Sequence, residues 1–288
     1  MNKNDYYINI ADIIVHIKIP FLFEITSETI NFICNPKKED IFFEFIEINE
    51  PIVVKGNCVF QNIINIYETE GEFINEFFPQ PGYDPYAWRI KISDSHYEIR
   101  YLKGKERYFS YSENIIKALS LEQILNKNNS FILHSSLISW KDKGILFSAP
   151  SGTGKSTQAD LWEKYENAEV INGDKAGIRK INDTWKAYGL PFAGSSNIFK
   201  NKNVDISCIL ILRQGEENKL EYISEKDAFI KIYSETTIHT WDKEYQNKTI
   251  EQITDLVKSV PIYIYKCLPN RSSVDYLKMM IEEKIVWD

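Results

Sequence analysis

The segment Ser151–Thr157, which reads SGTGKST, has the residue types of a loop that binds phosphate groups. Its glycines let backbone N–H groups turn towards phosphate oxygens, and a helix that begins at the loop adds free N–H groups and a positive dipole end. Lys155 can bridge the outer phosphates of a nucleotide, and the Ser156 hydroxyl, supported by Thr157, can bind Mg²⁺. The residues expected to bind the nucleotide are Ser151, Gly152, Thr153, Gly154, Lys155, Ser156 and Thr157.

The loop departs from the usual phosphate-binding pattern at Ala149, where that pattern has glycine. Alanine is acceptable there if its φ is negative, whereas Gly152 and Gly154 stand where phosphate comes closest. The apolar strand ILFS before the loop and a helix from Ser156 to about Tyr165 supply the context that the motif requires. This context favours a nucleotide site over a chance turn, but it leaves hydrolysis, switching and group transfer open.

Two further residues, Asp174 and His134, have side chains that could make such a site catalytic. Asp174 follows the predicted strand AEVIN, at the end where open α/β sheets bind their ligands. It can accept a proton from a hydroxyl group or hold Mg²⁺ through water, and the alternative is a solvated turn aspartate. His134 lies in the apolar strand FILHSSLISW, where a core histidine bonded to backbone is the simpler interpretation.

Three other residues are candidates for contact with a substrate. Gly194 and Ser195 belong to a Gly-Ser loop, GSS, that follows a predicted hairpin, and its backbone N–H groups could bind a substrate or a phosphate. Arg213 ends the apolar strand ISCILILR and could meet a phosphate or a carboxylate. An ordinary loop and a plain surface arginine are the alternatives.

The stretch LHSSLISWKDKGILFSAPSGTGKST, with AEVINGD after it, resembles the HPr kinase/phosphorylase family. That family shares its nucleotide-binding core with ATP-type phosphoenolpyruvate carboxykinases. The resemblance covers about residues 130–215 and implies an ATP- and Mg²⁺-dependent kinase. It also implies catalytic roles for Asp174, His134 and Lys155, with Ser156 and Asp174 near the metal. The segments YGLPFAGSS and VPIYIYKCLPNRSSVDYLKMMI are similar to those of smaller serine kinases that modify peptides, including lasso-peptide precursor kinases.

The chain departs from the family pattern in two places. The family has a pair of aspartates where this sequence has Asp174 and Lys175, so the role of Asp174 as base or as metal neighbour stays open. No segment after Lys180 repeats the glycine-rich signature of the HPr kinases, which weakens both HPr as the substrate and a reverse phosphorylase reaction. The resemblance favours a serine of a peptide or small protein as the acceptor. A small-molecule kinase and a non-catalytic nucleotide-binding regulator are the alternatives.

The elements that must position these residues fall into two predicted domains. Residues 1–111 read as a β-rich domain that could help to recognise a peptide by adding a strand. Residues 112–288 alternate strands and helices, which indicates an α/β domain, and by the resemblance a P-loop kinase domain of the HPr-kinase/phosphoenolpyruvate-carboxykinase type. A single helix is predicted over SENIIKALSLEQILNKNN, with its apolar residues on one face.

Composition limits the classes of partner. The net charge of −7 argues against a general nucleic-acid binder, and no apolar run has the length of a membrane span. The first residues lack the pattern of a signal peptide, and the four cysteines are scattered, which fits a cytoplasmic protein. The family resemblance also suggests a homo-oligomer.

Overall fold

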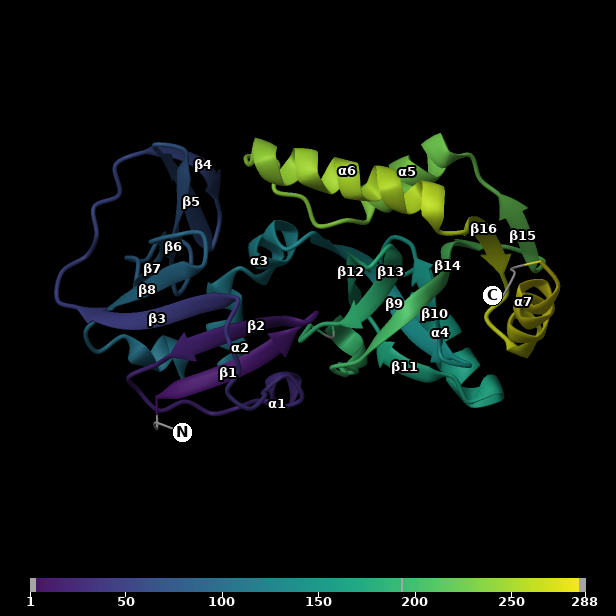
Figure 1. Ribbon diagram of the computed structural model, residues 1–288, viewed down its shortest axis with the longest axis horizontal. Helices are drawn as coiled ribbons and strands as arrows, with labels where there is room; N and C mark the ends of the chain where they lie inside the picture. The colour runs from purple at the N-terminus through teal and green to yellow at the C-terminus, as the bar shows by residue number, and fades with distance from the viewer. Residues whose placement is uncertain (1–3, 193, 285–288) are drawn as a thin grey trace. The chain divides into compact units, whose positions relative to one another are not determined.

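The chain is a mixed α/β protein with two eight-stranded mixed sheets, which agrees with the α/β class predicted from the sequence (Figure 1). The computed structural model describes residues 4–192 and 194–284. It divides into two compact units, Met1–Leu121 and Glu122–Asp288. The first unit ends at Leu121, whereas the sequence predicts the boundary after residue 111. Within the described residues, no helix is long and apolar enough to cross a membrane.

The first unit is built on a sheet in which the strand order is β1-β2-β3-β8-β7-β6-β5-β4. The β2–β3 and β3–β8 pairs are parallel and the others are antiparallel. The strands are β1 (Asp5–Ile10), β2 (Ile13–Lys18), β3 (Ile41–Ile48), β4 (Asn57–Gln61), β5 (Ile64–Thr69), β6 (Glu72–Phe77), β7 (Ala87–Lys91) and β8 (His96–Leu102). Alternate residues of β3 and β8, such as Phe43 and Ile99, are buried, as expected for strands with one face on a core.

Short helices accompany this sheet: α1 (Ser27–Ile30), η1 (Glu106–Phe109) and α2 (Ser112–Leu119). The single helix predicted from residue 112 to residue 129 is wrong, because Ser120 has a φ of 53° and ends α2. A separate helix, α3 (Leu121–Lys127), follows it.

The second unit contains a sheet in which five strands pair around a closed circuit, β10-β9-β12-β13-β14, with β14 returning to β10. β16 pairs with β14, β15 pairs with β16, and β11 pairs with β9. The strands are β9 (Ser130–Trp140), β10 (Lys143–Ser148), β11 (Glu169–Asn172), β12 (Lys175–Ile181), β13 (Thr184–Gly189), β14 (Asn203–Gln214), β15 (Lys219–Tyr222) and β16 (Ile262–Cys267).

Helices cover both faces of this second sheet (Figure 1). They are α4 (Lys155–Glu166), α5 (Glu225–Ser234), α6 (Lys243–Ser259) and α7 (Arg271–Lys284), with the short η2 (Gly194–Ser196). One core cluster joins the sheet to α5 and α6 through Ile232 and Ile253, and the other joins it to α4 and α7 through Trp162 and Leu277. This layering fixes the ends of the strands from which the candidate site residues project.

Candidate functional site

Strand pairing brings the loop, His134 and Asp174 to one place in the second unit. β9 lies between β10 and β12, with Ser135 opposite Ser148 and His134 opposite Lys175. The backbone N–H of Ser135 donates to the carbonyl oxygen of Asp174 at 3.0 Å. The loop follows Ser148 directly and Asp174 precedes Lys175, so residues from three separate segments meet at this point.

The loop has the backbone conformation that its glycines predict. Gly152 and Gly154 have φ values of 80° and 114°, which L-residues with a Cβ rarely adopt, and α4 begins at the next residue. Ala149, at the position where the usual pattern has glycine, is buried at the end of β10. Ser156 and Thr157 are exposed in the first turn of α4, where helical N–H groups lack partners within the helix.

The Lys155 ammonium group lies along the inside of the loop. Its Nζ donates to the carbonyl oxygen of Ala149 at 2.8 Å and to that of Pro150 at 3.4 Å. Burial lowers the pKa of Lys155, and the negative charges of Glu235 and Asp174 act in the opposite direction. The lysine of the loop is therefore within electrostatic reach of both carboxylates.

His134 stands between two carboxylates. Its Nε2 lies 3.5 Å from Oδ1 of Asp174, and its Nδ1 lies 3.1 Å from Oε2 of Glu235. The His134 backbone N–H also donates to the carbonyl oxygen of Glu235 at 2.8 Å. The hydrogen bond from His134 is the largest cause of a lowered pKa at Asp174, and the charges of Lys175, His134 and Lys155 add to it against burial. Asp174 is therefore ionised at neutral pH.

Glu235 is a site residue that the sequence reasoning missed. It follows α5 directly and lies 101 residues from His134 in the chain. The sequence places it only at the end of a predicted helix, and helical periodicity cannot show which strand that end meets. The side chain is 12 % exposed, which is unusual for an ordinary surface glutamate.

Asn172 holds the turn that carries Asp174. Its buried Oδ1 accepts the N–H groups of Asp174 and Lys175, both at 2.9 Å. Its Nδ2 donates to the carbonyl oxygens of Leu190 and Phe192 at 2.9 and 2.8 Å. The side-chain amide thereby ties the Asp174 turn to the segment that leads into η2.

The predicted substrate residues differ in where the structure places them. Gly194 lies against the catalytic candidate, because a Cβ added to it would be 2.7 Å from Cγ of Asp174. The side chain of Ser195 lies outside the described part of the chain. Arg213 is exposed at the end of β14 and lines a cavity beside the loop.

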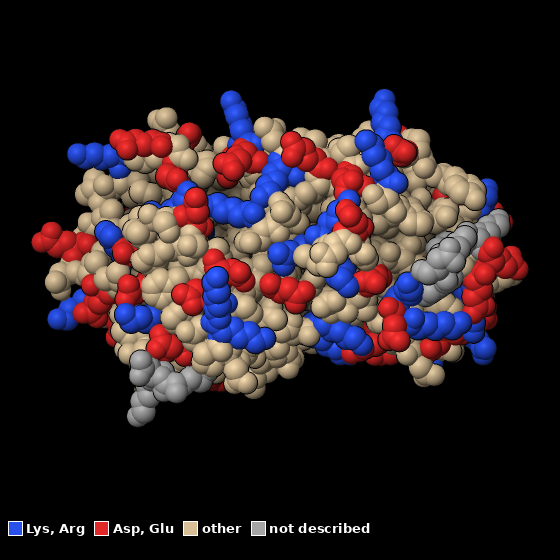
Figure 2. Space-filling model, in the orientation of Figure 1, with Lys and Arg blue, Asp and Glu red and all other residues tan. Residues whose placement is uncertain are grey.

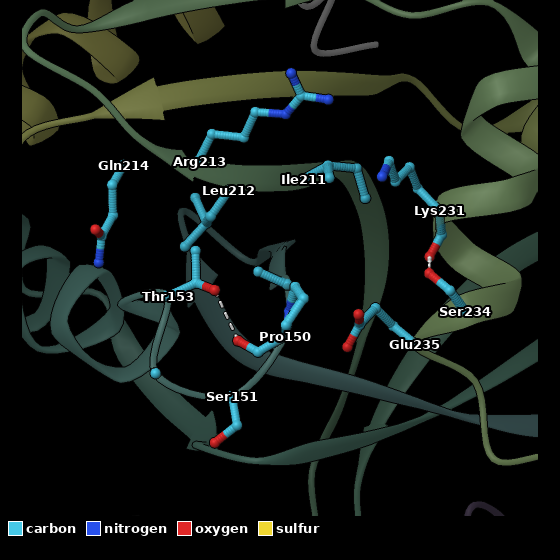
Figure 3. A pocket seen from close by; sticks show the side chains of 12 residues that line it. Pro150, Ser151, Thr153, Ile211, Leu212, Arg213, Gln214, Lys231, Ser234 and Glu235 are labelled. Atoms are coloured by element: carbon cyan, nitrogen blue, oxygen red, sulfur yellow. Dashed lines mark hydrogen bonds between the residues drawn. The ribbon is translucent and has the colours of Figure 1, made fainter.

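This cavity has a volume of about 500 Å³ and extends from the loop across the end of β14 to α5 (Figure 3). In Figure 3, Arg213 and Lys231 lie on either side of Ile211, and Glu235 faces the opening below them. Lys231, which the sequence reasoning did not single out, adds a second cation from α5. On the face seen in Figure 2, acidic and basic side chains are interspersed.

The oxygen donors near the loop could bind Mg²⁺ only together with the oxygens of a bound phosphate group. Among the residues that the structure describes, no three His, Cys, Asp or Glu side chains are grouped to hold a metal ion. The exposed Ser156 hydroxyl and the ionised Asp174 are oxygen donors of the kind that Mg²⁺ takes, usually one or two from the protein together with phosphates and water.

Comparisons with known proteins give a distant likeness among solved structures and none among sequences. No family model matches the chain, and no curated protein matches its sequence. Among solved structures, the HPr(Ser) kinase/phosphatase from Coxiella burnetii matches with a TM-score of 0.30 and 11% sequence identity. The match covers 52% of this chain and 92% of that chain. A function for this site therefore has to be argued from its own residues.

Proposed function

We propose that the second unit transfers the γ-phosphate of ATP to a hydroxyl group. The observation that carries this proposal is the ionised carboxylate of Asp174, held by His134 and the Asn172 turn beside the phosphate-type loop. A site that only bound nucleotide would need the loop but no fixed base next to it. A proton acceptor at a set position is the added requirement of transfer to a hydroxyl.

In the proposed reaction, the loop N–H groups and the first turn of α4 bind the phosphates. The Lys155 ammonium exchanges its bonds to loop carbonyls for bonds to the outer phosphates. Ser156, with Asp174 near it, would hold Mg²⁺ together with the nucleotide, and the ion would neutralise charge on the phosphates. The acceptor oxygen bonds to the γ-phosphorus, the bond from that phosphorus to ADP breaks, and the acceptor proton moves to Asp174 or, if Asp174 serves the metal, to solvent.

His134 and Glu235 would act as positioning residues in this scheme. The imidazole fixes one oxygen of Asp174, and Glu235 fixes the other ring nitrogen through a contact of 3.1 Å. Such a chain of hydrogen bonds reduces the number of orientations open to the carboxylate. The acceptor that we propose is a serine of a peptide or small protein, and a free hydroxy amino acid or another metabolite is the alternative.

Two substitutions test the proposal. Asp174→Asn removes the base and keeps the shape, so nucleotide binding should persist while turnover falls by about 10²–10⁴-fold. Lys155→Ala should weaken ATP binding as well as turnover. ATP binding is measured by calorimetric titration with Mg²⁺, and transfer by mass spectrometry of candidate peptides and hydroxy amino acids incubated with ATP.

The matched control is Asp183→Asn, which changes the same functional group at a fully exposed position on the β12–β13 turn. It should leave both measurements unchanged. Phosphoryl transfer at the wild-type rate by Asp174→Asn would show that the mechanism is wrong. A wild-type protein that does not bind ATP would remove the site assignment itself.

A further inference from the structure

The first unit contains a cavity of about 630 Å³ at the end of β3 and β8, which is a volume typical of small-ligand sites. We call it the acidic-aromatic cavity and define it by Phe21, Phe45, Glu47, Tyr101 and Glu106. Its remaining lining residues include Lys18 and Glu44. None of these residues belongs to the unit that carries the phosphate-type loop.

The strand pattern explains why a carboxylate lies beside aromatic rings here. Phe43 and Phe45 are buried on the core face of β3, and the next residue with the same direction is Glu47. Glu47 pairs in register with Tyr101 of β8. Beyond Phe45 this face of β3 reaches solvent, and Glu47 is exposed at a position where alternation would continue with an apolar side chain.

Tyr101 contributes to the cavity a hydroxyl group that has no protein partner among the described residues. The residue is 3 % exposed, and its hydroxyl makes no hydrogen bond with any residue that the structure describes. Phe21 packs edge-on against the Tyr101 ring, with centroids 5.3 Å apart and an interplanar angle of 84°. Burial raises the pKa of Tyr101 to about 12, with further contributions from the charges of Glu47 and Glu106. Both carboxylates therefore lie near this hydroxyl.

The negative charge of the cavity lacks an internal counter-ion. Lys18 is the basic residue of the lining, and its Nζ is bound to Glu44 at 2.7 Å. Within residues 4–192 and 194–284, Glu47 and Glu106 form no ion pair. Two free carboxylates around aromatic rings attract an organic cation, and a guanidinium is the best match because it is planar, weakly hydrated and able to bond carboxylates while stacking on rings.

An open strand edge beside the cavity indicates the source of that cation. The pairing of β2 with β3 ends at Lys18 and Glu44, while β3 continues to Ile48. In the described chain, the remaining residues of β3 pair with β8 on one side only. An open edge of this kind can bind an extended peptide through main-chain hydrogen bonds. A free polyamine has no backbone to use this edge.

We propose that the acidic-aromatic cavity binds the guanidinium group of an arginine in an extended peptide segment of a partner. The carboxylates of Glu47 and Glu106 take the cation, the rings of Phe21 and Tyr101 contact its plane, and the free edge of β3 pairs with the peptide backbone. This binding requires neither ATP nor phosphoryl transfer by the second unit, so it can be tested independently of the proposed kinase reaction.

The test uses the full chain without nucleotide and a capped pentapeptide, acetyl-Val-Thr-Arg-Thr-Val-amide, which carries a single charge. A peptide with glutamine in place of arginine is the matched ligand. Calorimetric or NMR titration should show the arginine peptide binding at least about fivefold more tightly. Glu47→Gln and Glu106→Gln should each weaken its binding by about fivefold, whereas the exposed Glu50→Gln should not change it.

Tyr101→Phe provides a second variant that keeps the ring and removes only the free hydroxyl. It should retain the fold, measured by circular dichroism, and weaken binding of the arginine peptide by about twofold. Equal affinity for the arginine and glutamine peptides would overturn the proposal, as would full affinity in both glutamate variants. A third peptide has lysine in place of arginine, and equal affinity for it would overturn the guanidinium assignment. Spermidine or arginine amide binding as tightly as the pentapeptide would overturn the peptide as occupant.

Discussion

The two units use carboxylates in opposite ways. In the second unit, Asp174 and Glu235 enclose His134, and the turn that carries Asp174 is fixed by Asn172. In the first unit, Glu47 and Glu106 lie beside aromatic rings with no ion-pair partner among the described residues. A carboxylate that accepts a proton at a set position needs hydrogen bonds that fix it there. A carboxylate that binds a cationic ligand has no partner until that ligand is bound.

The two kinds of carboxylate differ in what they contribute to stability. Supported carboxylates contribute to the stability of the folded chain, because their hydrogen bonds are made before any ligand binds. The exposed carboxylates of Glu47 and Glu106 have no ion-pair partner in the described chain, so they contribute little to stability before a ligand binds. Substitutions in the two units should therefore change stability and function in different proportions.

The largest expected effect follows from Asn172→Ala. This change leaves two partly buried N–H groups and two carbonyl oxygens without their partner, which should cost about 3 kcal/mol of unfolding free energy and most of the phosphoryl transfer. Urea unfolding measures the first effect. Asn172→Asp keeps an acceptor for the Asp174 and Lys175 N–H groups, so it should lose less unfolding free energy and less phosphoryl transfer than Asn172→Ala.

The control for this change is Asn201→Ala, an exposed asparagine in the same unit. It should alter the unfolding free energy by less than about 0.5 kcal/mol. If Asn172→Ala were as stable as this control, the support that distinguishes the second unit would not exist.

A smaller effect is expected from Glu235→Gln. The amide can still contact His134 but no longer holds it by charge, so kcat should fall by about tenfold with little change in the KM for ATP. Because Glu235 acts through His134, the double variant with Asp174→Asn should lose less kcat than the product of the losses in the two single variants. Glu225→Gln, at the other end of α5, is the matched control and should retain full turnover.

A change in KM alone would contradict the positioning role, since that result would place Glu235 in substrate binding. The role also predicts a spectroscopic change that does not depend on turnover. The ring signals of His134 in NMR spectra should broaden in Glu235→Gln and stay sharp in Glu225→Gln, because the ring gains freedom only in the former.

The part of the site that the sequence could predict is the part encoded locally. The loop, the helix after it and the strand before it follow from adjacent residues, and the family resemblance drew attention to His134 and Asp174. Glu235 and Lys231 could not be found in this way. They reach the site because α5 packs on the sheet, and no local spacing encodes that packing.

The fold shows the same limit. The periodicity of the first unit predicts a β-rich domain, but the sequences of β1 and β6 mix polar and apolar residues and give no clear strand signal of their own. The segment GDKAG has the composition of a loop, but only Gly173 and Asp174 lie outside the strands, since β12 begins at Lys175 and pairs with β9. Pairing with a distant strand, rather than local propensity, decides the conformation there.

The smallest expected effect compares one carboxylate from each unit at different pH values. Asp174 has a pKa lowered by its bond from His134, so its contribution to stability is present above the unfolded-state pKa of about 4 and is lost as pH falls through the lower folded-state value. At pH 7, Asp174→Asn should therefore be less stable than the wild type by up to about 1 kcal/mol, and this difference should shrink towards about pH 2. Glu47→Gln should be about as stable as the wild type at pH 7, because Glu47 is exposed and has no ion-pair partner in the described chain. Urea unfolding of both variants at the two pH values measures the contrast. Equal losses of stability in both variants at pH 7 would mean that Glu47 has a partner in the folded chain. That result would contradict the proposal that the acidic-aromatic cavity binds a cation.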